Sequence, residues 1–335
     1  MTGKKATTIK DIAEIAGVSL MTVSAVLSGK AEERRISVST RDRVREIAKN
    51  MDYRANAVAR SLRRKSTNVI GVYSGIGYLN AANSFLSELI GGLQEGCDEH
   101  HKDLLLHGTF RGLSADDIYT EFADGRLDGL IVQALPADPL IKRLTDSRLP
   151  VVAVVDAIPL IPSVVVDDAN GMRRIMAHLA DRGHRRIVHI SPRLMIESAK
   201  RRWQAVRESS RLYGIDVCEC NAVLGQDYAD TPLSRWLHES PEDRPSAITA
   251  WSDGIAYEFI AYCLNQGLRV PEDIAVSGFD GIPHPYLSTQ RLTSVRAPWR
   301  DIGRTAVGLL VSHISGLSMP IETVLPVEFI SGSTT

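Results

Sequence analysis

Apolar residues recur at helical spacing over residues 8–28 and predict two short helices that meet at a tight turn. Thr8 and Asp11 have the pattern of a capping box, in which a hydroxyl and a carboxylate bond to backbone N–H groups at the helix start. Gly17 stands where the turn needs a residue that tolerates positive φ, and Ser19 follows as the N-cap of the second helix. The predicted apolar face of the first helix is Ile12, Ala13, Ile15 and Ala16. This pattern is typical of a helix-turn-helix, whose second helix enters the major groove of DNA.

The second helix is predicted to turn one face to the first helix and the opposite face outward. At helical spacing, Met21 and Ala25 point away from the packing face, which holds Val23, Val26 and Leu27. The N-terminal residues of the outward face meet base edges in this motif. The predicted DNA contacts of this helix are Ser19, Leu20, Met21, Thr22, Ser24 and Ala25. Because Leu20 and Met21 are apolar, we expect them to touch thymine methyl groups. The alternative is a helical hairpin in some other α-domain.

From residue 68 onward, short continuous apolar runs alternate with amphipathic stretches, as expected for buried parallel strands and the helices that cover them. The first series predicts strands at 69–73, 104–107, 127–132 and 150–155, with a helix at 85–99. The alternation restarts after Asp167, with strands at 186–190, 221–224, 246–250 and 274–278 and helices at 169–182, 198–213 and 253–267. Two successive series of this kind predict two Rossmann-like α/β lobes with a cleft between them.

The balance of basic and acidic residues also changes near residue 65. Residues 1–65 contain 15 Lys and Arg against 7 Asp and Glu, whereas the remainder contains 24 against 33. A small basic domain on an acidic body is typical of a nucleic-acid-binding protein, because basic side chains displace the counterions that surround DNA phosphates.

The remaining motifs argue against an enzyme, a metal protein or a membrane protein. Gly75-x-Gly77 lacks the third glycine of a dinucleotide-binding loop, and the chain shows no phosphate-binding loop, nucleophile elbow or metal-ligand spacing. We expect the 4 cysteines to be buried, reduced thiols. The polar, basic N-terminus is unlike a signal peptide, and no run approaches the roughly 20 apolar residues of a membrane helix. The sequence therefore predicts a cytoplasmic protein that is not an enzyme and needs no cofactor.

Several motifs in the right order connect the basic region with a known family. Residues 8–62 contain TIKDIAEIAGVS, TVS-x-VLSGK, STRDRV and YRANAVARSL. This region resembles the headpiece of the lactose-repressor (LacI/GalR) family of bacterial transcription regulators. The resemblance implies an all-α helix-turn-helix headpiece of three helices at 1–54, followed by a hinge helix and linker at 55–67.

The resemblance also assigns roles around the hinge. Tyr53 and Asn56 stand where the family touches the DNA backbone or caps the hinge helix. Ala59 and Leu62 stand where the family enters the minor groove, the Leu acting as a wedge that kinks the duplex. A helix of under two turns cannot hold alone in water, because nucleation costs more than its few hydrogen bonds return. We therefore expect the hinge helix to form only when two copies pack against each other on DNA.

The rest of the chain resembles the periplasmic-binding-protein-like core of the same family, in motifs such as VDDANG and VPEDIAVSGFD. The resemblance implies an effector-binding and dimerisation domain at 68–335, with an N-lobe at about 68–166 and 297–323 and a C-lobe at about 167–296 and 324–333. Positions that match the family's effector site are Arg202, Asp253, Asp280 and Trp299, and Tyr228 supplies a further ring. Charged groups at the carboxyl ends of strands, with aromatic rings, suit a sugar-like ligand rich in hydroxyls. The alternative roles of the charged groups are helix capping or an ion pair between the lobes.

Together these features predict a homodimeric transcriptional repressor. Its partners are expected to be a pseudo-palindromic double-stranded DNA operator and a small-molecule effector, a sugar or related metabolite, bound between the lobes. A solute-binding protein for transport is a second possibility that the lobes alone would permit, although the basic headpiece argues against it. A third is a regulator that is controlled by a partner protein.

Overall fold

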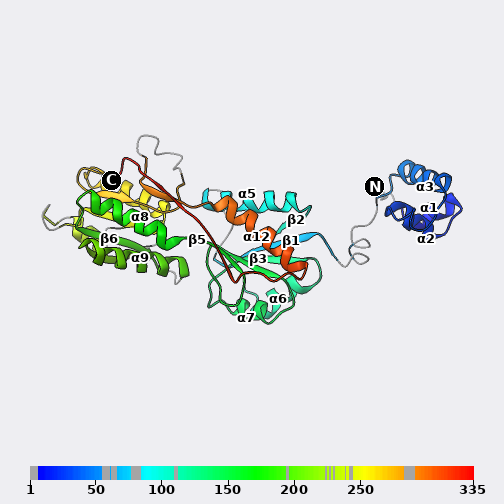
Figure 1. Cartoon of the computed structure of the whole chain (residues 1–335), viewed down its shortest axis with the longest axis horizontal. Coiled ribbons are helices and arrows are strands. Elements are labelled where there is room, and N and C mark those ends of the chain that lie inside the picture. Colours follow the sequence, from blue (N-terminus) through cyan, green and yellow to red (C-terminus); the bar gives the residue numbers. More distant parts are fainter. Residues whose placement is uncertain are drawn as a thin grey trace. The chain divides into compact units, whose positions relative to one another are not determined.

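The computed structural model describes residues 7–54, 61, 66–76, 84–108, 112–193, 196–222, 225, 228, 231–237, 239–240, 244–282 and 291–335. Contacts group the chain into two compact units, Met1–Thr67 and Asn68–Thr335 (Figure 1). Within the described part of both units, no helix combines the length and the apolar character that crossing a membrane requires.

The N-terminal unit is built from helices α1 (Ile9–Ala16), α2 (Leu20–Leu27) and α3 (Val38–Asn50). The predicted capping box is present: the Thr8 hydroxyl accepts from the Asp11 N–H, and the Asp11 carboxylate accepts from the Thr8 N–H at 2.7 Å. Gly17 has a φ of 61°, and Ser19 caps α2. Both ends of the predicted turn are therefore confirmed.

One face of each helix forms the core of this unit. Its buried residues are Ile12, Ala13, Ala16, Val23, Val26, Ala31, Val44 and Ala48. The prediction that Ile15 belongs to this core is wrong, since its side chain is 60% exposed. The reason is that α2 and α3 cover only the arc of α1 that carries the three buried residues, and Ile15 lies beyond the edge of that arc.

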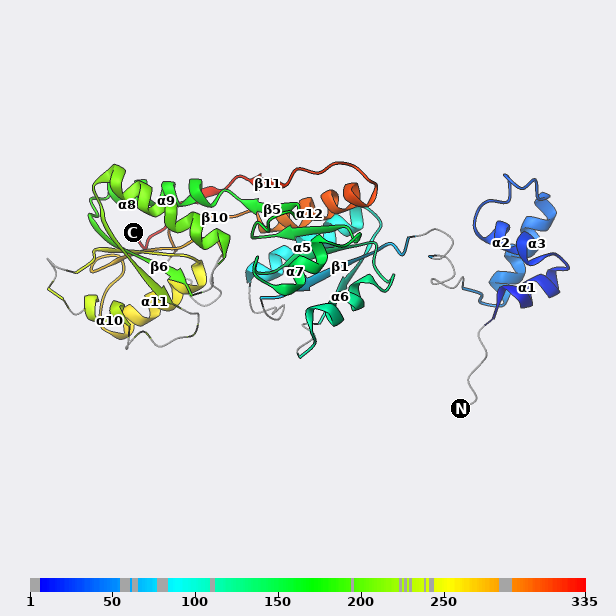
Figure 2. The same cartoon turned by 90° about the horizontal axis from the view of Figure 1, so that it is seen from below.

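The C-terminal unit contains two parallel sheets. The first is formed by β1 (Val69–Ser74), β2 (Asp103–Leu106), β3 (Gly129–Gln133), β4 (Val151–Val154), β5 (Ser163–Val166) and β11 (Glu322–Leu325). Its order is β11-β5-β4-β3-β1-β2, with every neighbouring pair parallel. Helices α5 (Ser84–Glu99) and α12 (Trp299–Ile314) lie side by side on one face, and α6 (Ala115–Ala123) and α7 (Pro139–Thr145) cover the other (Figures 1 and 2).

The second sheet repeats this plan with β6 (Arg186–Pro192), β7 (Asp216–Ala222), β8 (Ala247–Ala250) and β9 (Ala275–Ser277), in the order β7-β6-β8-β9. Helices α8 (Asp168–Asp181) and α9 (Glu197–Tyr213) cover one face, and α10 (Pro232–Leu237) and α11 (Asp253–Asn265) lie on the other (Figure 2). The strand predicted at 221–224 is misplaced, because β7 is an edge strand in which exposed and buried residues are mixed, rather than a continuous apolar run. The predicted α/β class with parallel sheets is confirmed.

The end of the chain joins both sheets. Strand β10 (Ser294–Arg296) pairs antiparallel with β12 (Glu328–Ile330), and Ser277 of β9 forms a bridge to Thr293 just before β10. Between β10 and β12, α12 packs on the first sheet and β11 extends it. The second crossing therefore follows Leu325, slightly later than the resemblance implies.

Glycines allow α5 and α12 to pack backbone against backbone. A Cβ atom on Gly92 would overlap the carbonyl oxygen of Arg300, and one on Gly303 would lie 2.5 Å from the carbonyl oxygen of Leu89. Backbone atoms of two packed helices cannot turn aside as the end of a long side chain can. Both positions therefore require glycine.

Gly92→Ala should lower the free energy of unfolding by about 1–3 kcal/mol, because an extra methyl group is forced into a filled helix contact. Gly91→Ala is the matched control: its Cβ would meet only the end of the Arg300 side chain, at 3.2 Å. We expect that control to be neutral or to gain up to about 1 kcal/mol from helix propensity. Urea denaturation followed by circular dichroism measures both, and equal stability of the two variants would contradict the close packing.

Candidate DNA-binding and effector-binding sites

The N-terminal turn of α2 is capped and exposed. Ser19 Oγ accepts a hydrogen bond from the Thr22 N–H at 3.1 Å, and the hydroxyls of Ser19 and Thr22 lie 2.9 Å apart. The side chains of Leu20 and Met21 are 49% and 65% exposed. The apolar pair that the sequence predicts to read bases is therefore open to a partner.

Ala25 does not share this exposure. It is buried, and the prediction that it points outward is wrong. The chain after α2 folds back onto the last turn, where the Lys30 N–H donates to the Ala25 carbonyl at 2.9 Å. A helical projection of α2 leaves out the segment that follows the helix, so it places Ala25 on an exposed face. Ser24 is half-buried, so the accessible part of the predicted surface is confined to the first turn.

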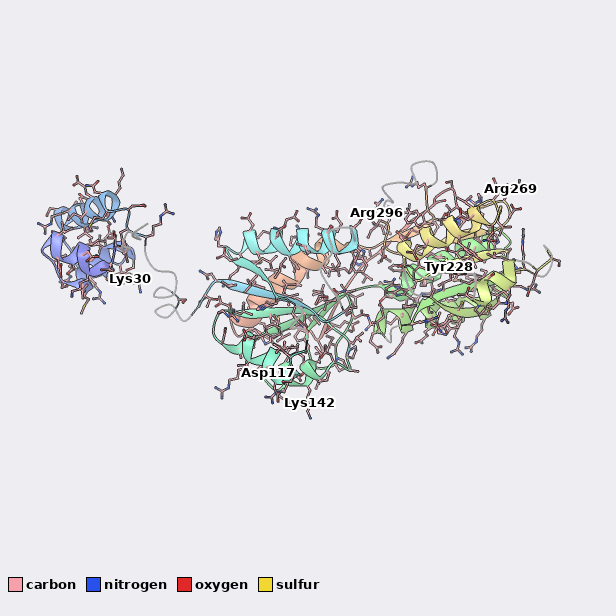
Figure 3. All side chains as sticks on the ribbon, turned by 180° about the vertical axis from the view of Figure 1, so that it is seen from behind. Lys30, Asp117, Lys142, Tyr228, Arg269 and Arg296 are labelled. Atoms are coloured by element: carbon pink, nitrogen blue, oxygen red, sulfur yellow. The ribbon has the colours of Figure 1, made fainter. Side chains whose placement is uncertain are left out.

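The described part of the hinge region is small. Tyr53 follows α3, is half-buried against the core of the N-terminal unit, and donates its backbone N–H to Ala48 at 2.9 Å. Three predicted hinge contacts, Asn56, Ala59 and Leu62, lie outside the described residues. Between α2 and α3 the basic side chains of Lys30, Arg34 and Arg35 are exposed, and Figure 3 labels Lys30.

The fully buried aspartates and arginines that the structure describes in the C-terminal unit lie in one region. Among the described residues, the fully buried aspartates and arginines are Asp156, Asp168, Asp253 and Arg202. They follow the carboxyl ends of strands β4, β5 and β8 or lie on α9, which covers the second sheet. In open α/β sheets, ligands bind beyond the carboxyl ends of strands where the strand order reverses. The second sheet reverses between β6 and β8.

The Arg202 guanidinium makes both hydrogen bonds and cation–π contacts with residues of the C-terminal unit. Its Nε donates to Asp168 Oδ1 at 2.8 Å, and its Nη1 donates to the Trp251 carbonyl at 2.6 Å. The guanidinium carbon lies 3.6 Å from the ring centroid of Phe279 and 5.6 Å from that of Trp251. Charge-assisted hydrogen bonds and cation–π contacts of this kind are strong where water is excluded. Arg202 is thus a fixed and already paired cation.

The other predicted carboxylates surround this cation. Asp253 Oδ1 accepts from Ser294 Oγ at 2.6 Å, and its Oδ2 accepts from the Ile282 N–H at 2.7 Å. Burial raises the pKa of both Asp168 and Asp253 to about 6. The charge of Arg202 partly offsets this effect at Asp168, whereas at Asp253 the hydrogen bond from Ser294 offsets it more than Arg202 does. Burial likewise raises the pKa of Asp280 well above its ordinary value, again against the pull of Arg202. The charge of Arg202 therefore acts on the pKa of Asp168, Asp253 and Asp280 alike.

Asp280 has a strained backbone. Its φ is 131°, a region that non-glycine residues rarely adopt. Hydrogen bonds hold it there, since its N–H donates to Val295 at 2.9 Å and its carbonyl accepts from Ala297 at 3.1 Å. Unlike Asp168 and Asp253, Asp280 is only half-buried. Strain that is kept by the surrounding fold is common at functional sites.

The two predicted aromatic residues are buried. Tyr228 lies beside α11 (Figure 3), where its ring packs against Phe259 and Tyr262. Trp299 begins α12 and meets Phe85 edge to face, with ring centroids 4.6 Å apart. The Tyr228 hydroxyl and the Trp299 indole N–H have no hydrogen-bond partner among the described residues. Neither ring forms an exposed stacking surface.

Sequence reasoning missed several members of this region. Asp168 and Phe279 occur inside motifs that carry the family resemblance, but those motifs gave them no role. Trp251 and Asp156 were not singled out either, although the Asp156 Oδ1 accepts from the Ser198 N–H at 2.7 Å. The available signal was their position, since Asp156, Asp168 and Trp251 each follow closely after a buried strand.

Known proteins resemble this chain in sequence and in fold. The family described as bacterial regulatory proteins, lacI family, matches residues 8–56, and a periplasmic binding protein-like domain matches residues 176–335. The transcriptional repressor PurR of Aliivibrio fischeri (strain MJ11) is 30% identical over 319 residues, which cover 92% of this chain and 91% of that protein. This chain belongs to the lacI family.

Other similar proteins cover almost the whole chain. Catabolite control protein A of Priestia megaterium is 29% identical over 317 residues, 92% of each chain. A crystal structure of the lac repressor dimer bound to operator and the anti-inducer ONPF has a TM-score of 0.81 at 24% identity and covers 98% of this chain and 99% of its own. A complex of the regulator CelR with cellobiose has a TM-score of 0.70 at 25% identity, covering 98% and 100%. Membership of this family confirms the predicted DNA-binding transcription regulator and confirms that the chain is not an enzyme.

Arg202→Gln should lower the free energy of unfolding by about 3–5 kcal/mol, because Asp168 is left as a buried acid without its cation. Arg207→Gln is the control, since Arg207 lies on the exposed face of the same helix. We expect that control to shift stability by less than about 0.5 kcal/mol. Denaturation followed by tryptophan fluorescence measures both, and similar stabilities would rule out a structural role for the ion pair.

The raised pKa of Asp253 predicts stability that falls as pH rises. The unfolded chain releases this proton near pH 3.8 and the folded chain near pH 6, so the folded state is favoured at low pH and loses that advantage between these values. Asp253→Asn should reduce this loss by about 1–3 kcal/mol in denaturation curves recorded between pH 4 and 7. Asp216→Asn, which alters an exposed carboxylate at the start of β7, should leave the slope unchanged. The same slope in both variants would contradict the assignment.

Proposed function

We propose that this protein is a transcriptional repressor that binds a pseudo-palindromic DNA operator as a homodimer in the cytoplasm. A small-molecule effector, a sugar or related metabolite, controls that binding from the cleft of the C-terminal unit. The observation that carries the proposal is the capped and exposed first turn of α2, on a basic unit of a lacI-family chain.

For DNA, we assign base contacts to Leu20 and Met21, with Ser19, Thr22 and Ser24 beside them. Apolar side chains at the start of a recognition helix suit thymine methyl groups. The basic side chains of the same unit supply the sequence-independent attraction to phosphates. We assign Tyr53, Asn56, Ala59 and Leu62 to the DNA backbone and minor groove. Two such units in a dimer face two half-sites, and the lac repressor structure similar to this chain is described as a dimer on operator.

For the effector, we assign Arg202, Asp253 and Asp280 as polar contacts and Tyr228 and Trp299 as the surrounding aromatic residues. Support comes from the concentration of buried charge at strand ends and from the strained backbone of Asp280. The CelR structure similar to this chain is described as a cellobiose complex, which favours a sugar.

The switch requires contacts that differ between two states. Candidates are the two hydrogen bonds from Arg201 to Glu322, the shorter at 2.6 Å, and the bond from the Ser198 N–H to Asp156. Both join the start of α9 to the first sheet and its strand ends, so a rotation of the lobes would break them. A tight switch needs an effector that prefers one state by about 5.5 kcal/mol.

A second candidate is a regulator whose DNA binding is controlled by a partner protein. It is favoured by the burial of Tyr228 and Trp299, because neither of these two rings is open to a ligand. A solute-binding role in transport is disfavoured by the helix-turn-helix unit.

The decisive experiment is selection of bound fragments of the source genome by the purified full chain. Enrichment of a pseudo-palindrome beside a transport or catabolic operon would support the proposal and indicate the chemical class of the effector. If no site is enriched at any salt concentration, the chain does not read DNA alone and the partner-controlled alternative takes precedence.

Leu20→Ala combined with Met21→Ala should weaken binding to the selected operator about tenfold or more, since each lost base contact costs about 1–3 kcal/mol. Unfolding of the variant should be unaffected, because both side chains are exposed. Leu212→Ala on α9, at a side chain that is 75% exposed, is the matched control. Fluorescence anisotropy with operator and with scrambled DNA measures the loss. Equal weakening on both DNAs would show that the pair does not read sequence.

A further inference from the structure

The loop between α2 and α3, residues 29–36, is anchored in the core of the N-terminal unit. Ala31 is 2% exposed and belongs to that core, and Ile36 packs against it. The Ile36 N–H donates to the Ala31 carbonyl at 3.0 Å, so the two anchors lie together. Residues 32–35 between them therefore form a compact turn, and their side chains are exposed.

An ion pair attaches this turn to α3. Arg41 Nη1 donates to Glu32 Oε1 at 2.9 Å, and the Arg41 side chain is only 19% exposed. The Arg35 N–H donates to the Glu32 carbonyl at 3.0 Å, and Arg35 has a φ of 52°. Residues other than glycine rarely adopt this region unless surrounding contacts hold them there. Glu32 therefore helps to fix the backbone that carries Arg35.

The remaining charges of the loop are mostly positive. Apart from the carboxylate that pairs with α3, the loop carries Lys30, Arg34 and Arg35 against Glu33. None of these four side chains has an ion-pair partner in the part of the chain that the structure describes. Cations that are already held in place and unpaired can bind an anion without first breaking an internal contact.

The loop lies on the face of α2 that carries Met21. Ala25 follows Met21 by four residues, so the two side chains lie on one face of the helix. Met21 is 65% exposed, whereas Ala25 is 4% exposed although it does not belong to the core of this unit. The Lys30 N–H donates to the Ala25 carbonyl at 2.9 Å, where the chain folds back over the last turn of α2. The loop therefore covers the second half of the face whose first half we assign to base edges.

This placement brings the loop within reach of DNA phosphates when α2 enters the major groove. Helix α2 has 8 residues and is therefore about 12 Å long, which is close to the width of the groove. With its first turn on base edges, its last turn lies near a sugar–phosphate strand. Arginine binds phosphate with a planar fork of N–H groups, so the guanidinium groups of Arg34 and Arg35 suit that strand.

We propose that Arg34 and Arg35 bind backbone phosphates beside each half-site, and that Glu32 is the positioning residue that holds this pair against α3. The inference rests on the proposed function, in which α2 reads the operator. Phosphate contacts fix the register of a protein on DNA but carry no sequence information. The arginine pair therefore strengthens binding to operator and to other DNA alike.

Salt dependence tests the arginine pair. Arg34→Gln combined with Arg35→Gln should lower the slope of log K against log salt concentration by about 2 for each N-terminal unit on DNA, hence about 4 for a dimer. Arg45→Gln combined with Lys49→Gln removes the same charge from the exposed side of α3 and is the matched control. We expect its slope to change by less than about half as much. Fluorescence anisotropy of the full chain with the selected operator and with scrambled DNA measures both slopes.

Two neighbouring carboxylates test the role of Glu32. Glu32→Gln and Glu33→Gln each remove one negative charge from the DNA-binding unit, and charge alone predicts that both bind DNA more tightly. Glu33→Gln should do so, by about twofold or more, because no contact to α3 is lost. Glu32→Gln loses the bond from Arg41, so we expect it to bind no more tightly than the unchanged chain.

Failure of this inference and failure of the proposed function give different results. If the chain binds the operator but both double variants lower the slope equally, Arg34 and Arg35 supply only diffuse attraction, and the inference fails while the regulator stands. Equal strengthening by Glu32→Gln and Glu33→Gln overturns the positioning role. If the unchanged chain binds neither operator nor scrambled DNA at low salt, the proposed function itself fails, and the phosphate contacts fail with it.

Discussion

The buried ion pair between Arg202 and Asp168 is the interaction on which the packing of α8 and α9 in the C-terminal unit depends. Both side chains are almost completely removed from solvent, so neither can exchange its partner for water without a large loss of free energy. The pair ties α9 to the start of α8, and the same guanidinium packs on Phe279 next to Asp280. The placement of α9 against α8 and the charge at the nearby strand ends therefore depend on this contact.

This contact lies next to the elements that join the two sheets. Strand β10 passes directly beside Asp280, after which the chain continues into α12 on the first sheet. Arg201, which precedes Arg202 on α9, forms an ion pair with Glu322 on β11. The surroundings of Arg202 thus lie close to β10 and β11, two strands near the points where the chain passes between the sheets. Allosteric control requires such a coupling between a ligand site and the elements that move.

Charged residues are placed differently in the two units. The basic residues of the N-terminal unit lie on its surface, where they attract phosphates over a distance that salt limits. The excess of acid in the C-terminal unit includes buried carboxylates, which act over short distances in a region of low dielectric. The first kind of charge suits recruitment to any DNA, whereas the second suits discrimination among small ligands.

The sequence by itself determined the helix caps, the turn at Gly17, the change from helical to strand periodicity near residue 68 and the charge of each part. These features depend on neighbours in the chain, so local rules are sufficient to predict them. The burial of Ala25 and the exposure of Ile15 were predicted wrongly, because both depend on how the neighbouring segments pack against α1 and α2. The same holds for the site. Motifs indicated Arg202, Asp253 and Asp280, but the partner Asp168 and the rings of Trp251 and Phe279 were recognised only once the fold was known. Pairing between α8 and α9, and the excess of buried acid around one guanidinium, arise from contacts between residues far apart in sequence, and only the tertiary structure decides those contacts.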